Sequence, residues 1–424
     1  MGVEKIMTII LTIIKLLIVL GIVATIHEFG HFLFAKLFKM TVNEFSIGFG
    51  PKIVQKKWKE TIYSLRWIPL GGYVAIEGEE GDSKDENAFS NKSPWKRIVV
   101  LVAGVVFNAI LATAIFLSVN LVTPTYSTQI ANLDENSVAY QAGLRDGDRI
   151  TKIDDKVTHI YQDIALYKET DNKDVTVEYI REGKPYTVIV RDAVKEIGYM
   201  GVYFDTSKLS DDGNVLTYVD MVEPGMPAST ADIKSGDKII KVAGNDVIYS
   251  EEIINIISAN PNKELEVVVL RGEEKVTLKV TPKAQLIFNL GTMGFVLEDT
   301  TLKTSYYKSI ATISQIVGSY VDLFKGEVAV TQLSGIVGIG EVVSKTEGFA
   351  DFLSMLGMIS LAVGIANILP FPPLDGGKVV LVLIEWITRK KVSVKVEAIL
   401  SYIGLALLLL LTVFVTINDI IRII

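Results

Sequence analysis

Cysteine is absent from this chain of 424 residues, histidine occurs only three times, and basic residues do not outnumber acidic ones. The lack of cysteine excludes disulfide bonds, a thiol nucleophile and a thiolate-ligated metal. It leaves the compartment open, since a soluble region outside a membrane needs no disulfide. The formal net charge of −7 gives no basic field, so nucleic acid is not an expected partner.

Hydrophobic residues are abundant instead. They make up 49 % of the sequence, beside 21 % charged residues, which indicates a membrane part joined to a soluble part. Four segments are long and apolar enough to cross a bilayer core of about 30 Å. These segments are 6–38, 97–122, 352–369 and 398–421. The first lacks a small-residue cleavage site, so we expect it to be a retained helix rather than a signal peptide.

Lysine and arginine are concentrated in two connections between these segments, 36–97 and 389–395. The positive-inside rule places both connections in the cytoplasm. Both termini and the long region between the second and third segments then lie outside it. Lys15, near the outer end of the first segment, is expected to extend its side chain to the membrane interface.

The first apolar segment contains the sequence His27-Glu28-Phe29-Gly30-His31, an HExxH motif. On a helix this spacing puts two imidazoles on one face, where both can bind one zinc ion, and the intervening glutamate can take a proton from a bound water. Ionisable groups at membrane depth are costly and usually mark function. The motif therefore predicts a zinc hydrolase that works inside or at the edge of a bilayer, near the cytoplasmic side.

A catalytic zinc normally has three protein ligands and one water. The third histidine, His159, falls in the region expected outside the cytoplasm, and we expect it to be a surface residue. The favoured third ligand is Asp375, which follows three prolines in the four positions 370–373. Prolines stop a helix, and non-helical backbone at membrane depth needs cover by protein or a water-filled cavity. The alternative is that Asp375 caps a helix beginning near Lys378.

The long middle region contains an internal repeat. Residues 136–150 recur as 225–239, and a glycine-containing segment at 197–201 recurs at 290–294. A period of about 90 residues is too long for a solenoid unit and suits two tandem domains. Helices are expected at 160–168 and 250–259. The pattern resembles the permuted PDZ domain of bacterial envelope proteases, a domain that binds an extended peptide or a C-terminus along a strand edge.

Shorter features flank the second and third apolar segments. Alternating residues at 62–67 predict a strand, and 69–75 predicts a hairpin or an edge strand. The acidic segment 77–86 is expected to be a solvated loop rather than a metal or partner site. Apolar residues at helical spacing within 305–325 predict an amphipathic helix, either on the outer membrane surface or packed on the repeated domains.

These features together resemble the site-2 protease family of intramembrane zinc proteases, in particular the bacterial regulator of sigma-E type with tandem PDZ domains. The resemblance rests on a membrane HExxH, a later N-x-x-P-x-P-x-L-D-G-G at 367–377 and PDZ-like domains between them, with supporting motifs at 48–51, 71–74, 93–97 and 333–339. It implies one Zn²⁺ per chain, held by His27, His31 and Asp375, with Glu28 as general base. Val105 and Ile336 stand where the family often has proline, which bears on local helix shape.

Four further residues are candidates for contact with substrate. Asn108 and Asn367 are polar groups in membrane segments, and the resemblance favours substrate or oxyanion contact; steadying a metal ligand and ordinary helix–helix hydrogen bonding are the alternatives. Gly72 and Tyr73 lie in the predicted hairpin. A peptide bond inside a helix is shielded, so a substrate must become extended, and this hairpin is expected to receive it by strand addition.

The predicted fold is a polytopic α-helical membrane protein with about four transmembrane helices, a cytoplasmic membrane-associated β-hairpin region and two extracytoplasmic PDZ domains. It is expected to be a multi-pass protein of the inner or plasma membrane. The expected order of domains is a first transmembrane helix at 1–38, the β-hairpin region at 39–96, a second helix at 97–123, PDZ domains at 124–205 and 206–300, an amphipathic helix and linker at 301–351, a third helix with the LDG motif at 352–377, a cytoplasmic segment at 378–397 and a fourth helix at 398–424.

The predicted function is that of an intramembrane zinc endopeptidase that cuts single-pass membrane proteins. The resemblance implies anti-sigma factors after a first cut and remnant signal peptides as substrates, with the PDZ pair as a size filter. A protease of prenylated CaaX proteins would share only HExxH and would use a glutamate as third ligand. An inactive scaffold that recruits peptides through the PDZ pair is the alternative from another class. The expected partners are substrate, PDZ-bound peptide and lipid, without a small-molecule cofactor.

Overall fold

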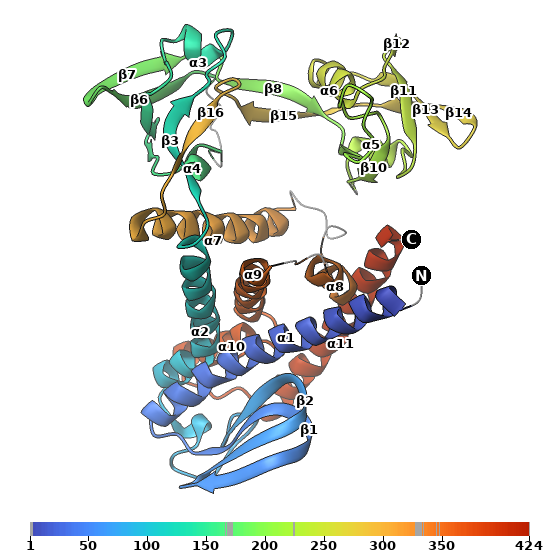
Figure 1. Cartoon of the computed structure of the whole chain (residues 1–424). Coiled ribbons are helices and arrows are strands. Elements are labelled where there is room, and N and C mark those ends of the chain that lie inside the picture. Colours follow the sequence, from blue (N-terminus) through green and yellow to red (C-terminus); the bar gives the residue numbers. More distant parts are fainter. Residues whose placement is uncertain are drawn as a thin grey trace. The chain divides into compact units, whose positions relative to one another are not determined.

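The computed structural model describes residues 3–423 except 166, 168–172, 224, 327–332, 334, 345 and 347. The chain divides into two compact units (Figure 1). The helical unit comprises Met1–Thr123, Thr301–Val321 and Leu333–Ile424, and the β-rich unit comprises Pro124–Thr300 and Asp322–Gln332. Each is described by itself below.

Four helices of the helical unit are long and apolar enough to cross a membrane. They are α1 (Val3–Leu37), α2 (Pro94–Asn120), α9 (Phe349–Asn367) and α11 (Val394–Ile423). Many of their large apolar side chains are about half exposed on the protein surface, as on Met7, Ile10 and Leu410. Such surfaces require hydrocarbon around them. The four apolar segments of the sequence thus correspond to these helices, and the chain is a polytopic membrane protein.

Helix α2 is the centre of this unit, since it packs against α1, α9 and the shorter α10 (Asp375–Thr388). One apolar core joins Val23 of α1 to Ile115 of α2 and Met355 of α9. A second core lies at the other end and includes Leu101 of α2 and Val382 of α10. Helix α2 therefore holds the N-terminal and C-terminal parts of the chain together.

Helix α8 (Ile336–Ser344) packs against α1 and α11. The buried carboxylate of Asp419 accepts the backbone N–H groups of Gly335 and Gly338, at 2.9 and 2.8 Å, and so caps this helix. The Lys15 ammonium donates to the carbonyl and hydroxyl oxygens of Thr346, in the connection between α8 and α9, at 2.9 and 3.1 Å.

Helix α7 (Leu302–Phe324) matches the predicted amphipathic helix. The end of α2 bonds to it, because the Asn120 side chain donates to Ser309 Oγ and the Ser305 hydroxyl donates to the Asn120 carbonyl, both at 3.0 Å. Its apolar residues Tyr306 and Val321 remain exposed. The helix packs on α2 and α9 through these polar contacts and through Ile313 and Ile316, which lie against Phe116 and Leu361, and it leaves its other apolar side chains uncovered.

The predicted β-hairpin region consists of β1 (Val42–Trp58) and β2 (Thr61–Ile76). Both strands bend, so that one part of each strand pairs with two parts of the other. The first part of β1 pairs on one side with the start of β2, as Phe45 with Tyr63, and on the other with its end, as Phe45 with Val74. The residues 72–76 are consequently an edge strand of this sheet. The predicted strand at 62–67 and the predicted hairpin or edge strand at 69–75 both belong to β2.

The acidic segment 77–86 is a loop with exposed residues, as predicted, but several of its carboxylates are engaged. Glu77 accepts from Asn43 and Ser83, and Asp85 accepts from Thr41. A short 3₁₀ helix (Phe89–Asn91) follows the segment. Side chains of the segment also form ion pairs with Lys378 and Lys391 in and after α10. These bonds hold the segment in a defined conformation.

The β-rich unit contains two modules built around separate apolar cores. The first has a sheet in the order β16-β3-β4-β6-β7 and the second a sheet in the order β12-β11-β13-β14. The strands of the first are β3 (Thr125–Ala131), β4 (Arg149–Ile153), β5 (Lys156–Val157), β6 (Val175–Arg181), β7 (Lys184–Val190) and β16 (Gly294–Glu298), with helices α3 (Val138–Gln141) and α4 (Tyr161–Ala165). Those of the second are β9 (Val202–Phe204), β10 (Val219–Val222), β11 (Lys238–Val242), β12 (Asn245–Asp246), β13 (Leu265–Arg271) and β14 (Glu274–Val280), with α5 (Pro227–Thr230) and α6 (Ser250–Ser258).

The two modules are nested, which differs from the predicted tandem ranges 124–205 and 206–300. Strand β16 follows the second module in sequence but pairs with β3 of the first, and β9 pairs with β10 of the second. The paired strands β8 (Val194–Tyr199) and β15 (Lys283–Phe288) join the modules, as Figure 1 shows. The predicted helix at 250–259 corresponds to α6. The predicted helix at 160–168 begins as α4, and its last part lies outside the described residues.

An equivalent ion pair supports the sequence repeat in each module. Arg181 binds Asp148, at 2.7 Å between Nε and Oδ1, and Arg271 binds Asp237 at 2.8 Å. Both aspartates are almost fully buried, with 0 % and 1 % of the side chain exposed, and each also accepts a backbone N–H from the preceding turn. Paired contacts from one guanidinium stabilise a buried carboxylate. The repeat is therefore a duplication of structure as well as of sequence.

Substitution of Arg271 by methionine should destabilise the second module, because it leaves the Asp237 carboxylate buried without its cation. We expect a loss of about 2 kcal/mol, less than for a fully buried pair since 32 % of the Arg271 side chain is exposed. Amide hydrogen exchange of peptides from 225–282 in the full chain measures this loss. The control is Lys279→Met, whose ion pair with Glu264 is exposed on both sides and should change nothing measurable. Equal exchange in both variants would contradict the assignment.

Candidate metal centre and active site

The HExxH motif lies in a continuous part of α1, so His27 and His31 are one helical turn apart on the same face. Both are 7 % exposed, and their Nε2 atoms lie 3.1 Å from each other. The helix alone therefore brings two nitrogen ligands to one point.

The other ring nitrogens are held from α2. His31 Nδ1 lies 2.8 Å from the carbonyl oxygen of Val100, to which it donates its hydrogen. His27 Nδ1 lies 3.4 Å from the side-chain amide of Asn108. For His31, a hydrogen on Nδ1 leaves Nε2 with a free lone pair, which is the arrangement of a metal-binding imidazole.

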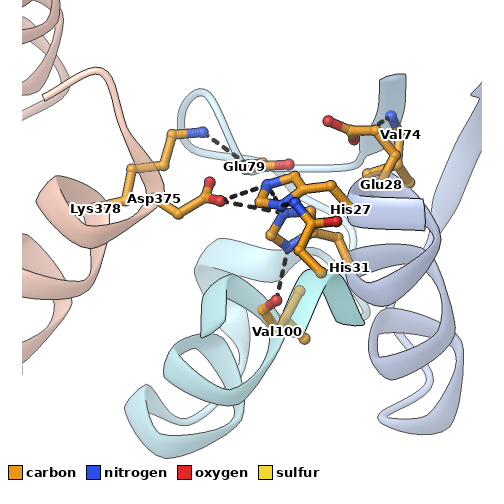
Figure 2. A network of polar contacts seen from close by, with 9 residues as sticks. His27, Glu28, His31, Val74, Glu79, Val100, Asp375 and Lys378 are labelled. Carbon is orange, nitrogen blue, oxygen red and sulfur yellow. Dashed lines mark hydrogen bonds and ion pairs between the residues drawn. The ribbon is translucent and has the colours of Figure 1, made fainter. Parts of the chain in front are cut away.

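Asp375 completes the group from the far end of the sequence (Figure 2). Its Oδ2 lies 2.9 Å from His27 Nε2 and 3.3 Å from His31 Nε2. Helix α9 ends at Asn367, and α10 begins at Asp375 after the proline-containing turn. The N-cap of α10 is Leu374, so Asp375 is not the cap and its carboxylate is directed at the histidines.

These three side chains fit a zinc ion. Two imidazole nitrogens and a carboxylate oxygen are all electron-pair donors, and such atoms repel one another unless a proton or a metal cation lies between them. Ligands bound tetrahedrally to zinc lie roughly 3.3 to 3.6 Å apart, close to the observed separations of 2.9 to 3.3 Å. Within the described residues, His27, His31 and Asp375 form a group able to hold a metal ion. His159 is exposed and belongs to the β-rich unit, as expected.

Glu28 points to the β-hairpin rather than into the ligand group. Its Oε2 accepts the backbone N–H of Val74 at 3.0 Å (Figure 2). Val74 belongs to the edge strand 72–76, and this N–H lies on the side away from β1. The carboxylate is therefore next to both the ligand histidines and the free edge of a strand.

Two glycines allow α1 and α2 to approach closely at the site. A Cβ atom on Gly30 would lie 2.5 Å from the Ala103 carbonyl oxygen of α2. A Cβ atom on Gly104 would lie 2.4 Å from His31 Nε2 and 2.8 Å from His27 Nε2. Distances below about 3 Å are steric overlap, so only glycine fits at either position.

The remaining predicted site residues are distributed differently. Asn108 is fully buried, and its Oδ1 is a buried atom with no hydrogen-bond partner in the described part of the chain. Asn367 is the last residue of α9 and is partly exposed. Gly72 and Tyr73 lie on the edge strand, where the Tyr73 hydroxyl accepts from Arg66 at 2.8 Å. The structure thus brings Asn108 to a histidine, whereas Gly72 and Tyr73 lie along the strand edge.

Sequence reasoning missed several contributors to the site. The carbonyl of Val100 has no sequence signal, because any residue supplies one. Gly104 and Lys378 stood next to recognised motifs without an assigned role. Glu79 was included in the acidic segment that we expected to be solvated, although it pairs with Lys378 at 2.7 Å. The signal in the sequence that could have predicted this pair is the position of Lys378, a cation directly after the LDGG sequence 374–377.

Substitution of Gly104 by alanine should weaken zinc binding, because the new methyl group overlaps both ligand nitrogens. Displacement of the ligands should lower zinc affinity about tenfold or more. Metal content after gel filtration and competitive zinc titration measure this loss. The control is Gly318→Ala, at a helix position in α7 with open space around the added Cβ. Unchanged zinc affinity in Gly104→Ala would argue against the ligand group.

Comparisons with known proteins identify the family of this chain. The family model of peptidase family M50 matches residues 15–411. The zinc metalloprotease RasP of Oceanobacillus iheyensis is 29 % identical, and the match covers 97 % of this chain and 99 % of that protein. A Fusobacterium nucleatum protein is 31 % identical over 97 % of this chain and 98 % of its own length, and one from Thermotoga maritima is 27 % identical over 97 % and 99 %. Both are named as zinc metalloproteases. This chain therefore belongs to peptidase family M50, the site-2 proteases, and is an intramembrane zinc metalloendopeptidase.

Proposed function

We propose that this protein binds one zinc ion per chain through His27, His31 and Asp375 and cuts the transmembrane segment of single-pass membrane proteins. The observation that carries the proposal is the convergence of these three ligand atoms, from helices far apart in sequence, at a buried point on a membrane helix. An inactive scaffold has no need for this buried group. A CaaX-type protease would use glutamate in place of Asp375.

Glu28 is the proposed general base. Zinc, when bound, would act as a Lewis acid that polarises the scissile carbonyl and lowers the pKa of a coordinated water. Glu28 takes the proton of the attacking water and returns it to the leaving amine. Its hydrogen bond from Val74 fixes one carboxylate oxygen and leaves the other for this proton transfer.

The edge strand 72–76 is the proposed place for the substrate backbone. The N–H of Val74 faces away from β1, so an extended peptide laid along this edge passes beside Glu28. Strand addition supplies main-chain hydrogen bonds and keeps the peptide extended. Gly72 and Tyr73 would contact the peptide there. Asn367, partly exposed at the end of α9, is a proposed further contact.

Asn108 has a different proposed role. Because it is fully buried against His27 Nδ1, it steadies a metal ligand rather than meeting substrate. Its unpartnered Oδ1 supports this role, since amide oxygen and nitrogen exchange by a simple flip and the flipped oxygen would accept the Nδ1 hydrogen.

The two modules of the β-rich unit are proposed to be PDZ domains outside the cytoplasm, with the β-hairpin on the cytoplasmic side. The duplicated strands, short helices and Arg–Asp pairs support the identity of the modules as PDZ domains. The distribution of lysine and arginine supports the assignment of the modules and the hairpin to opposite sides of the membrane. In this arrangement the modules would restrict access to substrates already shortened by a first protease. Anti-sigma factors after a first cut and remnant signal peptides are the proposed substrate classes.

Replacing Glu28 by glutamine and Asp375 by alanine should separate the two roles. Glu28→Gln should retain zinc and lose cleavage by about a hundredfold or more, because it removes only the base. Asp375→Ala should lose zinc affinity. Zinc content and cleavage of a single-pass substrate, in detergent or liposomes, measure both effects.

The same assay should use the substrate with and without its bulky external domain. Cleavage that survives in Glu28→Gln would contradict the proposed mechanism. Equal rates on both substrate forms would contradict the size filter and leave the mechanism unaffected.

Replacing Val74 by proline should impair use of substrate while zinc is retained, because proline removes the outward N–H of the edge strand. We expect kcat/KM to fall about tenfold or more, as for loss of a buried main-chain hydrogen bond and of Glu28 orientation. Val74→Thr keeps the backbone N–H and is the matched control. Cleavage by Val74→Pro at the wild-type rate would count against strand addition.

A further inference from the structure

Lys378 and Glu79 form an ion pair next to the metal centre. Lys378 Nζ lies 2.7 Å from Glu79 Oε1, and only 26 % and 19 % of the two side chains are exposed. Lys378 is three residues after Asp375 on α10, so both side chains lie on the same face of that helix. Glu79 is three residues after Ile76, the end of the edge strand.

This pair closes a continuous chain of contacts around the site, which Figure 2 shows. Asp375 of α10 contacts the two histidines of α1, and Glu28 of α1 bonds to Val74 of the edge strand. The segment after that strand returns to α10 through Glu79 and Lys378. Three elements, α1, β2 and α10, are therefore tied to one another in a ring.

Apolar packing beside the ion pair also joins the edge strand to α10. Ile76, the last residue of the edge strand, and Val382 of α10 are both buried in one core with Leu101 of α2. Val382 is four residues after Lys378 and continues the same helix face. Packing holds the two elements together, and the ion pair joins them at the turn of α10 that carries Asp375.

We propose that Lys378 and Glu79 are positioning residues that hold the Asp375 carboxylate in register with the histidines and with the substrate strand. The proposal rests on the proposed function, in which Asp375 is a zinc ligand. Residues that orient metal ligands without touching the metal affect affinity strongly, by about 10- to 100-fold.

The charge of the pair is as important as its position. Burial acts to lower the pKa of Lys378, but the carboxylates of Glu79, Asp375 and Glu397 outweigh burial and raise that pKa above its ordinary value. The ammonium therefore stays charged beside them. Removal of either partner would leave the other poorly solvated and unpaired, and this is more damaging than loss of an exposed pair.

A second ion pair supplies a matched control. Lys391, three residues after the end of α10, lies 3.4 Å from Asp82 of the same acidic segment. It joins the same two parts of the chain, but 60 % and 74 % of its side chains are exposed. If the ion pairs only attach the acidic segment to α10, loss of either pair should change zinc affinity equally. If Lys378 and Glu79 position Asp375, only loss of their pair should change it.

The test is competitive zinc titration of the full chain in detergent, with every variant made on the Glu28→Gln background. Zinc affinity then reports on the site without cleavage. The variants are Lys378→Met, Glu79→Gln, the charge exchange of Lys378→Glu with Glu79→Lys, and the conservative Lys378→Arg. The control is Lys391→Met, and the melting temperature of each metal-free protein is measured in parallel.

We expect Lys378→Met and Glu79→Gln to bind zinc about tenfold or more weakly. Lys378→Arg, the charge exchange and Lys391→Met should all stay within about threefold of the parent. If Lys378→Met does not fold, the isosteric Glu79→Gln decides.

A zinc affinity of Glu79→Gln equal to that of the Glu28→Gln parent would overturn the proposal. A loss of zinc affinity in Lys391→Met as large as that in Lys378→Met would also overturn it. A lower melting temperature with unchanged zinc affinity would show a purely structural pair and overturn it too. Failure of the proposed function would appear differently, as absence of zinc binding by the Glu28→Gln parent or absence of cleavage by the wild-type protein.

Discussion

Three electron-pair donors, His27 Nε2, His31 Nε2 and Asp375 Oδ2, meet within about 3 Å of one another in a largely buried place. Without a shared cation this arrangement is unfavourable, and at membrane depth water offers little screening. A shared proton relieves part of this repulsion when metal is absent, and the fold must hold the three atoms together in either state. Much of the helical unit is understandable as the structure that does so, because α1, α2 and α10 each contribute one part of the constraint.

Helix α2 contributes no ligand and yet determines the geometry of the site. Its Val100 carbonyl fixes one imidazole, its Asn108 amide lies against the other, and Gly104 makes room for both rings. The same helix also packs against α9, which leads into the Asp375 turn. A site assembled from two distant segments thus depends on a third segment that carries the orienting groups.

In the proposed function, the β-hairpin connects the metal centre to recognition of substrate. Glu28 lies between the two, since it follows His27 in α1 and accepts a hydrogen bond from the strand edge. Strand edges usually carry a risk of unwanted pairing. Here the edge lies beside the Glu28 carboxylate, and the proposed use of its main-chain groups is to pair with an extended substrate. The acidic segment that follows then returns to α10, so the position of the strand and that of Asp375 are set together.

The sequence by itself determined the local features: four apolar helices from runs of apolar residues, two facing histidines from HExxH, a break before Asp375 from its prolines, and duplication from the repeat. Each depends on neighbours in the chain or on composition. Only the tertiary structure decided which oxygen or nitrogen each group meets, as with Val100, Gly104 and Glu79. It also decided that β16 returns to the first module, because strand pairing is satisfied by main-chain groups that every residue has. Long-range partners of that kind leave no pattern in the sequence, and they emerge only when packing brings distant segments together.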